Sequence, residues 1–240
     1  YYPDFNLRLA RAAKRFRVPV LYYISPQVWA WRKGRVETIR NCVDRMAVIL
    51  PFEKDFYRER GLDVEHVGHP LLEEIPTDLD GKKVRTELGL HQASPVLALL
   101  PGSRKEEVTN LLPTMIEAAE KLHAKHADLK CLLPCASTIP AELLDGILKK
   151  SSLDIQVLHG DVYRVLKACD LALVASGTAT LEAAILETPM VVVYRVSFLS
   201  YWIGRMVISV PFIGLVNLVA GEEVVPELIQ GDVTPERLAQ

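Results

Sequence analysis

Two short glycine-containing segments hold the residue types that could bind a phosphate group. In the first, LLPGSRKEEV (99–108), Gly102, Ser103 and Arg104 lie between an apolar run and a helix-forming run. A glycine lets the backbone approach a ligand, helix N-terminal N–H groups attract an anion, and Arg104 can hold two phosphate oxygens at once. The segment matches neither GxGxxG nor a P-loop, so an ordinary turn with a surface arginine is the alternative.

The second segment, ASGTATLEAA (175–184), has the same character. Ser176, Gly177 and Thr178 form a small turn rich in hydrogen-bond donors, and Glu182 follows four residues after Thr178, on the same helix face. A carboxylate there can accept hydrogen bonds from both hydroxyls of a ribose, and a solvated helix residue is the alternative. Two such turns at the ends of parallel strands predict a site for a nucleoside diphosphate.

A third segment, SPQVWAWRKGRVETIR (25–40), combines aromatic and basic side chains. Residues 1–60 hold 13 Lys and Arg against 6 Asp and Glu, which gives +7, although the whole chain carries −2. Tryptophan suits the headgroup level of a membrane, and cations suit its phosphates. The candidates for contact with a membrane or a phosphorylated lipid are Trp29, Trp31, Arg32, Lys33 and Arg35. Packing under a cleft is the alternative for Trp29, and a nucleic-acid site would need several such segments.

The apolar stretch FLSYWIGRMVISVPFIGLVNLVAG (198–221) is long enough to invite comparison with a membrane span. Arg205, Pro211 and Asn217 interrupt it, and an arginine in mid-span costs about 2.5–3.5 kcal/mol. A helix lying on a membrane surface, with Trp202 and Arg205 at the headgroups, and a buried core helix fit equally well. Asn217 and the acidic residues that follow it predict a polar loop over a cleft.

The remaining reactive residues predict no metal site and no cofactor. The four cysteines have no CxxC spacing and fit reduced thiols in a cytoplasmic protein. His123 and His126 have no evident third ligand. The chain shows no signal peptide and begins without a methionine, in a stretch typical of a helix, so we expect a fragment.

Alternating apolar runs and amphipathic stretches must position these segments. They predict strands at 18–24, 43–50 and 64–68, then, after a polar linker at 69–83, at 94–100, 129–134, 154–160, 169–176 and 189–196. The pattern is that of an α/β protein with parallel sheets. We expect two Rossmann-like domains, residues 1–75, which are short of strands, and residues 76–240.

Seven segments, in their order along the chain, together resemble the lipid-A-disaccharide synthase family: PDFN, YYISPQVWAWR, LPFEKDFY, VGHP, LLPGSRKEEV, ASGTATLEAA and VNLVAGEEVVPELIQ. The resemblance implies a GT-B glycosyltransferase, with two Rossmann-like domains facing across a cleft. It implies transfer of 2,3-diacylglucosamine from its UDP form to 2,3-diacylglucosamine 1-phosphate, with inversion, to give the β-1,6-linked lipid A disaccharide and UDP. It also implies a peripheral enzyme on the cytoplasmic face of the inner membrane of a Gram-negative-type bacterium.

The resemblance gives the candidate residues roles. Arg104, as catalytic residue, and the 176–178 turn would stabilise the departing UDP without a metal, Glu182 would bind the ribose, and Asn217 and Glu222 would lie in the cleft. The family's catalytic aspartate falls at Tyr1, and both the glycine-rich N-terminal loop and the end of the family pattern are missing. The oligomeric state is open, with a homodimer as one option.

Two other functions stay open. One is a UDP-sugar epimerase of the same fold, which would leave the aromatic and apolar surfaces without a use. The other is a non-catalytic UDP-binding fragment, because the part that carries the catalytic base is absent.

Overall fold

The computed structural model describes residues 2–31, 33–76, 78–207 and 210–240, and it divides into two compact units. Unit 1 comprises residues 1–74 and 202–211, and unit 2 comprises residues 75–201 and 212–240. The first boundary lies next to the one expected at residue 75. The sequence did not predict the return of residues 202–211 to unit 1. Helix α10 (Phe198–Val207) carries the chain from one unit to the other.

Unit 1 contains a three-stranded parallel sheet in the order β1-β2-β3. In its register, Tyr23 of the first strand pairs with Ala47 of the second. The core of this unit includes Ile39 and Tyr57, which are fully buried. The elements are α1 (Pro3–Arg15), β1 (Leu21–Tyr23), α2 (Arg35–Cys42), β2 (Arg45–Val48), α3 (Pro51–Arg58), β3 (Glu65–His66) and α4 (Leu71–Glu74).

Unit 2 contains a six-stranded parallel sheet in the order β6-β5-β4-β7-β8-β9. Its strands are β4 (Val96–Leu100), β5 (Lys130–Cys135), β6 (Ile155–His159), β7 (Leu171–Ala175), β8 (Met190–Tyr194) and β9 (Glu227–Ile229). Counted from β4, this is the 3-2-1-4-5-6 order of a complete doubly wound sheet. The strand order therefore reverses between β4 and β7, which pair directly.

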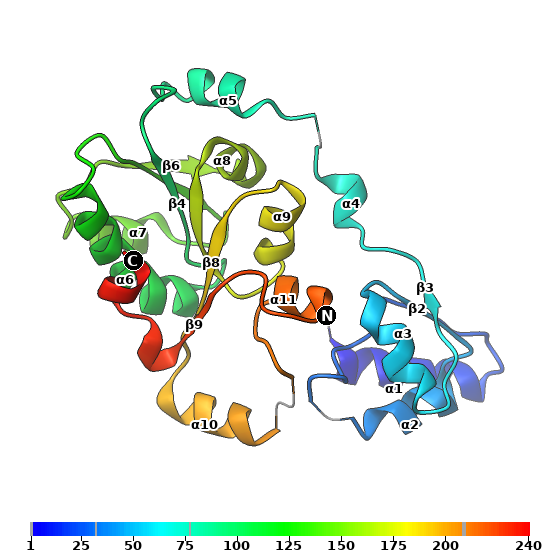
Figure 1. Cartoon of the computed structure of the whole chain (residues 1–240). Coiled ribbons are helices and arrows are strands. Elements are labelled where there is room, and N and C mark those ends of the chain that lie inside the picture. The colour runs from blue at the N-terminus through cyan, green and yellow to red at the C-terminus, as the bar shows by residue number, and fades with distance from the viewer. Residues whose placement is uncertain (1, 32, 77, 208–209) are drawn as a thin grey trace. The chain divides into compact units, whose positions relative to one another are not determined.

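Helices cover both faces of the unit 2 sheet (Figure 1). They are α5 (Gly81–Glu87), α6 (Lys105–His123), α7 (Ala141–Leu148), α8 (Val162–Ala168), α9 (Ala179–Ile185), α11 (Leu215–Ala220) and α12 (Pro235–Leu238), with a short 3-10 turn at Gln230–Asp232. Helices α6 and α7 lie on one face, and α8 and α9 lie on the other. Every residue of β4 is buried, which explains its uninterrupted apolar sequence VLALL. The predicted α/β class with parallel sheets is confirmed.

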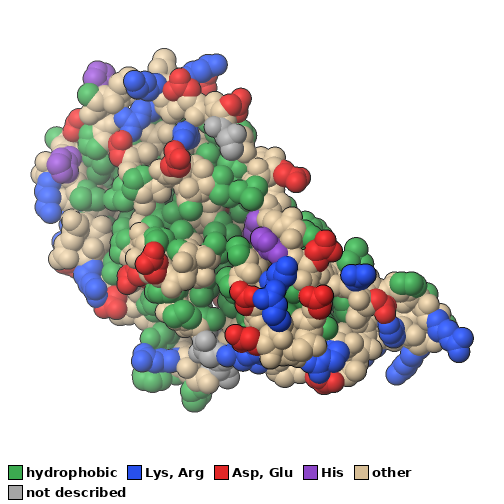
Figure 2. Space-filling model, turned by 45° about the vertical axis from the view of Figure 1, so that its right-hand side comes forward, with side chains coloured by type: hydrophobic (Ala, Val, Ile, Leu, Met, Phe, Trp, Pro, Cys, Tyr) green, Lys and Arg blue, Asp and Glu red, His purple; other side chains and the backbone are tan. Residues whose placement is uncertain are grey.

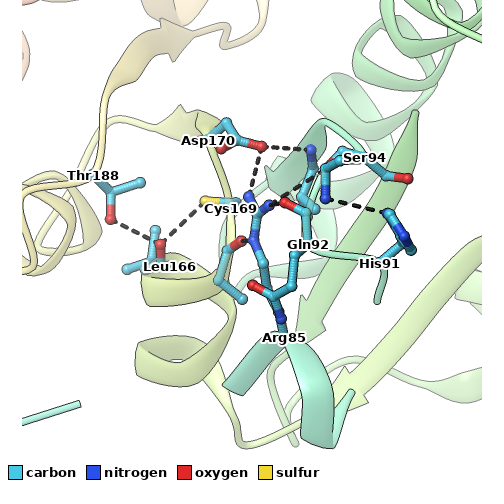
Figure 3. A network of polar contacts seen from close by, with 11 residues as sticks. Arg85, His91, Gln92, Ser94, Leu166, Cys169, Asp170 and Thr188 are labelled. Atoms are coloured by element: carbon cyan, nitrogen blue, oxygen red, sulfur yellow. Dashed lines mark hydrogen bonds and ion pairs between the residues drawn. The ribbon is translucent and has the colours of Figure 1, made fainter. Parts of the chain in front are cut away.

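The predicted linker at 69–83 contains structure instead, because helix α5 is fixed to the sheet by Arg85. The guanidinium pairs with Asp170 at 2.7 Å and donates to the carbonyl oxygens of Ala168 at 2.8 Å and Gln92 at 2.9 Å. Asp170 also accepts the N–H of Val96 at the start of β4 (Figure 3). Helix α5 and the start of β4 thus meet the distant segment that begins β7, at the end of the sheet where both strands begin.

Within the described ranges, no helix combines the length and the apolar character needed to cross a membrane.

Candidate functional site

A pocket of about 420 Å³ lies in unit 2 where β4, β5, β6 and β7 end. It is at the carboxyl edge of the sheet, at the reversal of strand order between β4 and β7, where ligands of doubly wound folds bind. Its walls include Gly102, Ser103 and Arg104 after β4, and Ser176, Gly177, Thr178 and Glu182 after β7. The structure therefore brings both predicted phosphate-binding turns to one pocket.

The turn between β4 and α6 is built around a residue that the sequence analysis did not select. The Glu107 carboxylate accepts the N–H groups of Ser103 at 3.0 Å and Arg104 at 3.1 Å through Oε2. Its Oε1 accepts from the Arg104 guanidinium at 2.8 Å. The expectation of free N–H groups at these two positions is therefore wrong, because a carboxylate of the same helix already binds them. The signal was a glutamate three residues after the helix N-cap.

Gly102 is required by this turn for two reasons. Its φ of +107° lies in a region that residues with a side chain rarely adopt. A Cβ atom there would lie 2.3 Å from Glu107 Oε2 and 2.8 Å from Glu107 Cβ. The backbone at 101–104 can therefore close over the carboxylate only because residue 102 has no side chain.

The turn between β7 and α9 is held from outside the helix. Ser176 donates its backbone N–H to Val193 at 2.9 Å and its hydroxyl to the carbonyl oxygen of Ile213 at 2.8 Å. A Cβ atom added to Gly177 would meet nothing within 4 Å, so the turn faces open space. Glu182 lines the same pocket and is half-buried. A bound molecule could contact the backbone of Gly177 and the Glu182 carboxylate together.

The ends of β5 and β6 add a less polar wall that the sequence analysis missed. It includes Pro134, Cys135, Ala136 and Val162. Burial raises the pKa of the Cys135 thiol, so this cysteine stays protonated at neutral pH. The signal was available, since neighbouring parallel strands end at the same edge of a sheet. This wall suits the flat, largely uncharged part of a ligand whose anionic part meets the two turns.

Asn217 and Glu222, expected in the cleft, do not line this pocket. Asn217 is fully buried, and its amide donates to Val225 and Glu227 at 2.8 Å and accepts the N–H groups of Val224 and Val225. These hydrogen bonds give Asn217 a structural role in the loop after α11, and its contact with a ligand stays a prediction. Glu222 is exposed.

Trp29, expected at a membrane surface, lies in the interior of unit 1 with 6 % of its surface exposed. Its indole Nε1 donates to Glu53 Oε1 at 3.0 Å, and its ring packs edge-to-face on Phe52. The alternative of structural packing therefore holds for Trp29. Burial raises the pKa of the Glu53 carboxyl, although hydrogen bonds from Leu50 and Trp29 oppose this rise.

The other residues expected at a membrane differ in exposure. Trp31, Lys33, Trp202 and Arg205 are exposed. Arg35 is mostly buried and pairs with Asp4. Arg32 lies outside the described residues, as does Tyr1, the position at which the resemblance predicts a catalytic aspartate. In the view of Figure 2, basic and acidic side chains are interspersed over the surface.

Among the described residues, no group of three or more His, Cys, Asp or Glu side chains is arranged to hold a metal ion.

The sequence matches the family model described as lipid-A-disaccharide synthetase over residues 1–240. The chain belongs to this family. It is 54 % identical over 239 residues to the lipid-A-disaccharide synthase of Syntrophus aciditrophicus, and 50 % identical over 238 residues to that of Myxococcus xanthus. The matches cover 99 % of this chain but 62 % of each relative, so the chain spans less than two thirds of their length.

Solved structures with the same fold are much more distant in sequence. The UDP-GlcNAc 2-epimerase of Neisseria meningitidis, solved with UDP-GlcNAc, has a TM-score of 0.62 at 12 % identity and matches 97 % of this chain and 63 % of its own. The corresponding Methanocaldococcus jannaschii enzyme has a TM-score of 0.60 at 15 % identity, with 96 % and 63 % covered. These likenesses show the fold alone.

Proposed function

We propose that the protein carrying this chain is a lipid-A-disaccharide synthase. It would transfer 2,3-diacylglucosamine from its UDP form to 2,3-diacylglucosamine 1-phosphate and release UDP. The observation that carries the proposal is the pocket at the β4/β7 reversal, lined by both turns of a chain that belongs to this family. The pocket lies wholly within unit 2, so UDP binding is the part of the activity that this chain can be tested for directly.

In this proposal the two turns stabilise the charge that grows on UDP as the glycosidic bond to the donor sugar breaks. Arg104 offers a guanidinium with five N–H donors, of which Glu107 uses one. The Gly177 backbone approaches the diphosphate from the β7 side, and the Glu182 carboxylate accepts from the ribose hydroxyls. Fixed donors of this kind stabilise a developing anion because they need no reorganisation during the reaction.

Contact with lipid substrates is assigned to unit 1. Trp31 and Lys33 after β1, and Trp202, Arg205 and Met206 on α10, supply exposed aromatic, apolar and cationic side chains. These residue types favour peripheral binding to an anionic membrane surface. We propose that this surface gives access to acylated donors and acceptors that stay in the bilayer.

A test of the nucleotide site is the affinity of this chain for UDP, measured by isothermal titration calorimetry. Replacing Arg104 by alanine removes charged hydrogen bonds worth about 1.5–3 kcal/mol, so UDP should bind roughly 10–100-fold more weakly. Lys105→Ala is the matched control, because it removes an exposed cation next to Arg104 that does not line the pocket. Equal affinities for UDP in the Arg104→Ala variant and the unaltered chain would remove Arg104 from the site.

The activity itself is tested with the whole gene product that contains this sequence. Incubation with both diacylglucosamine substrates in mixed micelles should yield UDP and the tetraacyl disaccharide phosphate in equal amounts. Conversion of UDP-N-acetylglucosamine to its manno epimer, without disaccharide formation, would favour an epimerase instead. UDP binding with neither product would identify a nucleotide-binding module.

A further inference from the structure

Glu107 places a carboxylate in the wall of a pocket that is proposed to bind a diphosphate. It lines the pocket and carries a negative charge, so its Coulomb interaction with a bound anion is unfavourable. Two unit charges about 4 Å apart interact by about 1 kcal/mol even in water, which corresponds to about a fivefold change in affinity. If charge alone mattered, removing this carboxylate would tighten UDP binding.

The contacts of Glu107 give it a role that can outweigh this repulsion. One carboxylate oxygen accepts the backbone N–H groups of Ser103 and Arg104, and the other accepts from the Arg104 guanidinium. The turn is also braced from the segment after β5, where the Thr138 hydroxyl donates to the Ser103 carbonyl oxygen at 2.6 Å. Glu107 therefore fixes both the backbone of the turn and the side chain that it presents.

Arg104 needs such a constraint. Its side chain is 83 % exposed, so little packing restricts its rotamers. A free arginine side chain loses rotamer entropy when it binds a ligand, and this loss weakens the binding. The ion pair with Glu107 restricts the guanidinium before a ligand arrives, and its planar fork keeps further donors for phosphate oxygens.

Resting on the proposed function, we infer that Glu107 is the positioning residue of the diphosphate site. It holds the 101–104 turn closed and keeps Arg104 at the rim of the pocket, and this gain exceeds the repulsion between its own charge and the diphosphate. It acts through Arg104 and does not itself contact the ligand.

The test compares three variants of this chain by calorimetric titration with UDP and with uridine, which has no phosphate. Glu107→Gln keeps a carbonyl oxygen for the backbone N–H groups but loses the ion pair with Arg104. Glu107→Ala loses both. Glu106→Gln is the matched control, because it removes the same charge from an exposed neighbour that does not line the pocket.

We expect UDP to bind about tenfold more weakly to Glu107→Gln and more weakly still to Glu107→Ala. Uridine should bind all variants within about twofold of the unaltered chain, and Glu106→Gln should bind UDP as the unaltered chain does. Circular dichroism at the titration temperature should show that each variant is folded, because one helix cap contributes only a small part of the stability of a domain.

Two results would overturn the inference while leaving the proposed function in place. One is UDP binding to Glu107→Gln that is equal to or tighter than that of the unaltered chain, as charge alone predicts. The other is an equal loss for UDP and uridine, which would mean that Glu107 only maintains the fold of the pocket. If the unaltered chain binds no UDP, the proposed function and the inference fail together.

Discussion

Replacing Gly102 by alanine should destabilise unit 2 and open the β4–α6 turn. The added Cβ atom would lie 2.3 Å from Glu107 Oε2, so the carboxylate must leave the N–H groups of Ser103 and Arg104. Loss of this cap costs about 1 kcal/mol, and an alanine held at φ +107° costs about 1–3 kcal/mol. Together these give about 2–4 kcal/mol of unfolding free energy at 25 °C.

Thermal unfolding can assign this loss to the correct unit. The three tryptophans, Trp29, Trp31 and Trp202, all belong to unit 1, so tryptophan fluorescence reports its unfolding. Circular dichroism at 222 nm reports both units. For a unit of about 150 residues, a loss of 2–4 kcal/mol lowers the midpoint by about 4–16 °C. We expect the Gly102→Ala variant to show this shift by circular dichroism and a smaller one by fluorescence.

The matched control is Gly146→Ala, in the exposed interior of helix α7, where a Cβ atom would meet nothing within 4 Å. It should raise the unfolding free energy by about 0.5–1 kcal/mol, because alanine favours a helix. The reasoning is refuted if Gly102→Ala unfolds within 2 °C of the unaltered chain and binds UDP with unaltered affinity, since the turn would then accommodate a side chain.

Three further predictions concern other parts of the chain. Gly177→Ala should leave the thermal midpoint unaltered but weaken UDP binding in calorimetry, because its Cβ atom enters open pocket space; unchanged affinity would place the ligand elsewhere. Arg85→Ala should lower the urea-unfolding free energy of unit 2 by about 2 kcal/mol, since it removes a mostly buried guanidinium that donates to the carbonyl oxygens of Ala168 and Gln92 and pairs with Asp170, whereas a loss under 0.5 kcal/mol would contradict this. Burial raises the pKa of the Glu53 carboxyl. Between the ordinary carboxyl pKa and this raised value, the native state therefore binds more protons than the unfolded chain, and stability is highest at pH values below this window. It should fall as pH rises through the window, and Glu53→Gln should remove this slope when unfolding is followed by tryptophan fluorescence; an unchanged slope would assign it to another group.

Much of the fold could be predicted because parallel strands buried on both faces leave a plain signal. The runs VLALL at 96–100 and LALVA at 171–175 have no polar residue, and both are β-strands paired with each other. The turns that follow them were found for the same reason, since a glycine after a buried strand is easy to recognise. The predicted strands are longer than the observed ones by two to four residues, except 129–134, which has the length of β5 but begins one residue earlier. Strand ends carry no strong sequence signal.

The elements that were missed depend on contacts between distant residues. Strand β9 is only three residues long and exists because it pairs with β8, more than 30 residues earlier. Helix α5 follows a segment with a proline, and it is held by Arg85 and Asp170, which are far apart in sequence. No local pattern contains such information.

In the candidate site, too, residues with a local sequence signal were predicted, and the partners that they contact were missed. Trp29, Arg104 and Asn217 were predicted from the sequence as site residues, and each of these side chains donates a hydrogen bond to a glutamate that was not predicted. Donors with aromatic, guanidinium or amide groups are conspicuous in a sequence, whereas Glu53 and Glu107 near helix starts and Glu227 at the start of β9 resemble ordinary surface residues.

These three glutamates, Glu53, Glu107 and Glu227, share one arrangement. Each accepts two consecutive backbone N–H groups at the start of a helix, at residues 49–50, 103–104 and 213–214. A carboxylate has about four acceptor sites, so it can bind these two N–H groups and still orient a side chain from the same turn or from a distant one. The same arrangement of a carboxylate with two backbone N–H groups is found beside Trp29, which is buried, and beside Arg104, which is exposed at the pocket. The sequence therefore predicted where the two turns lie, but not which carboxylate orients each donor, because the carboxylate and its N–H partners are recognised only in the folded chain.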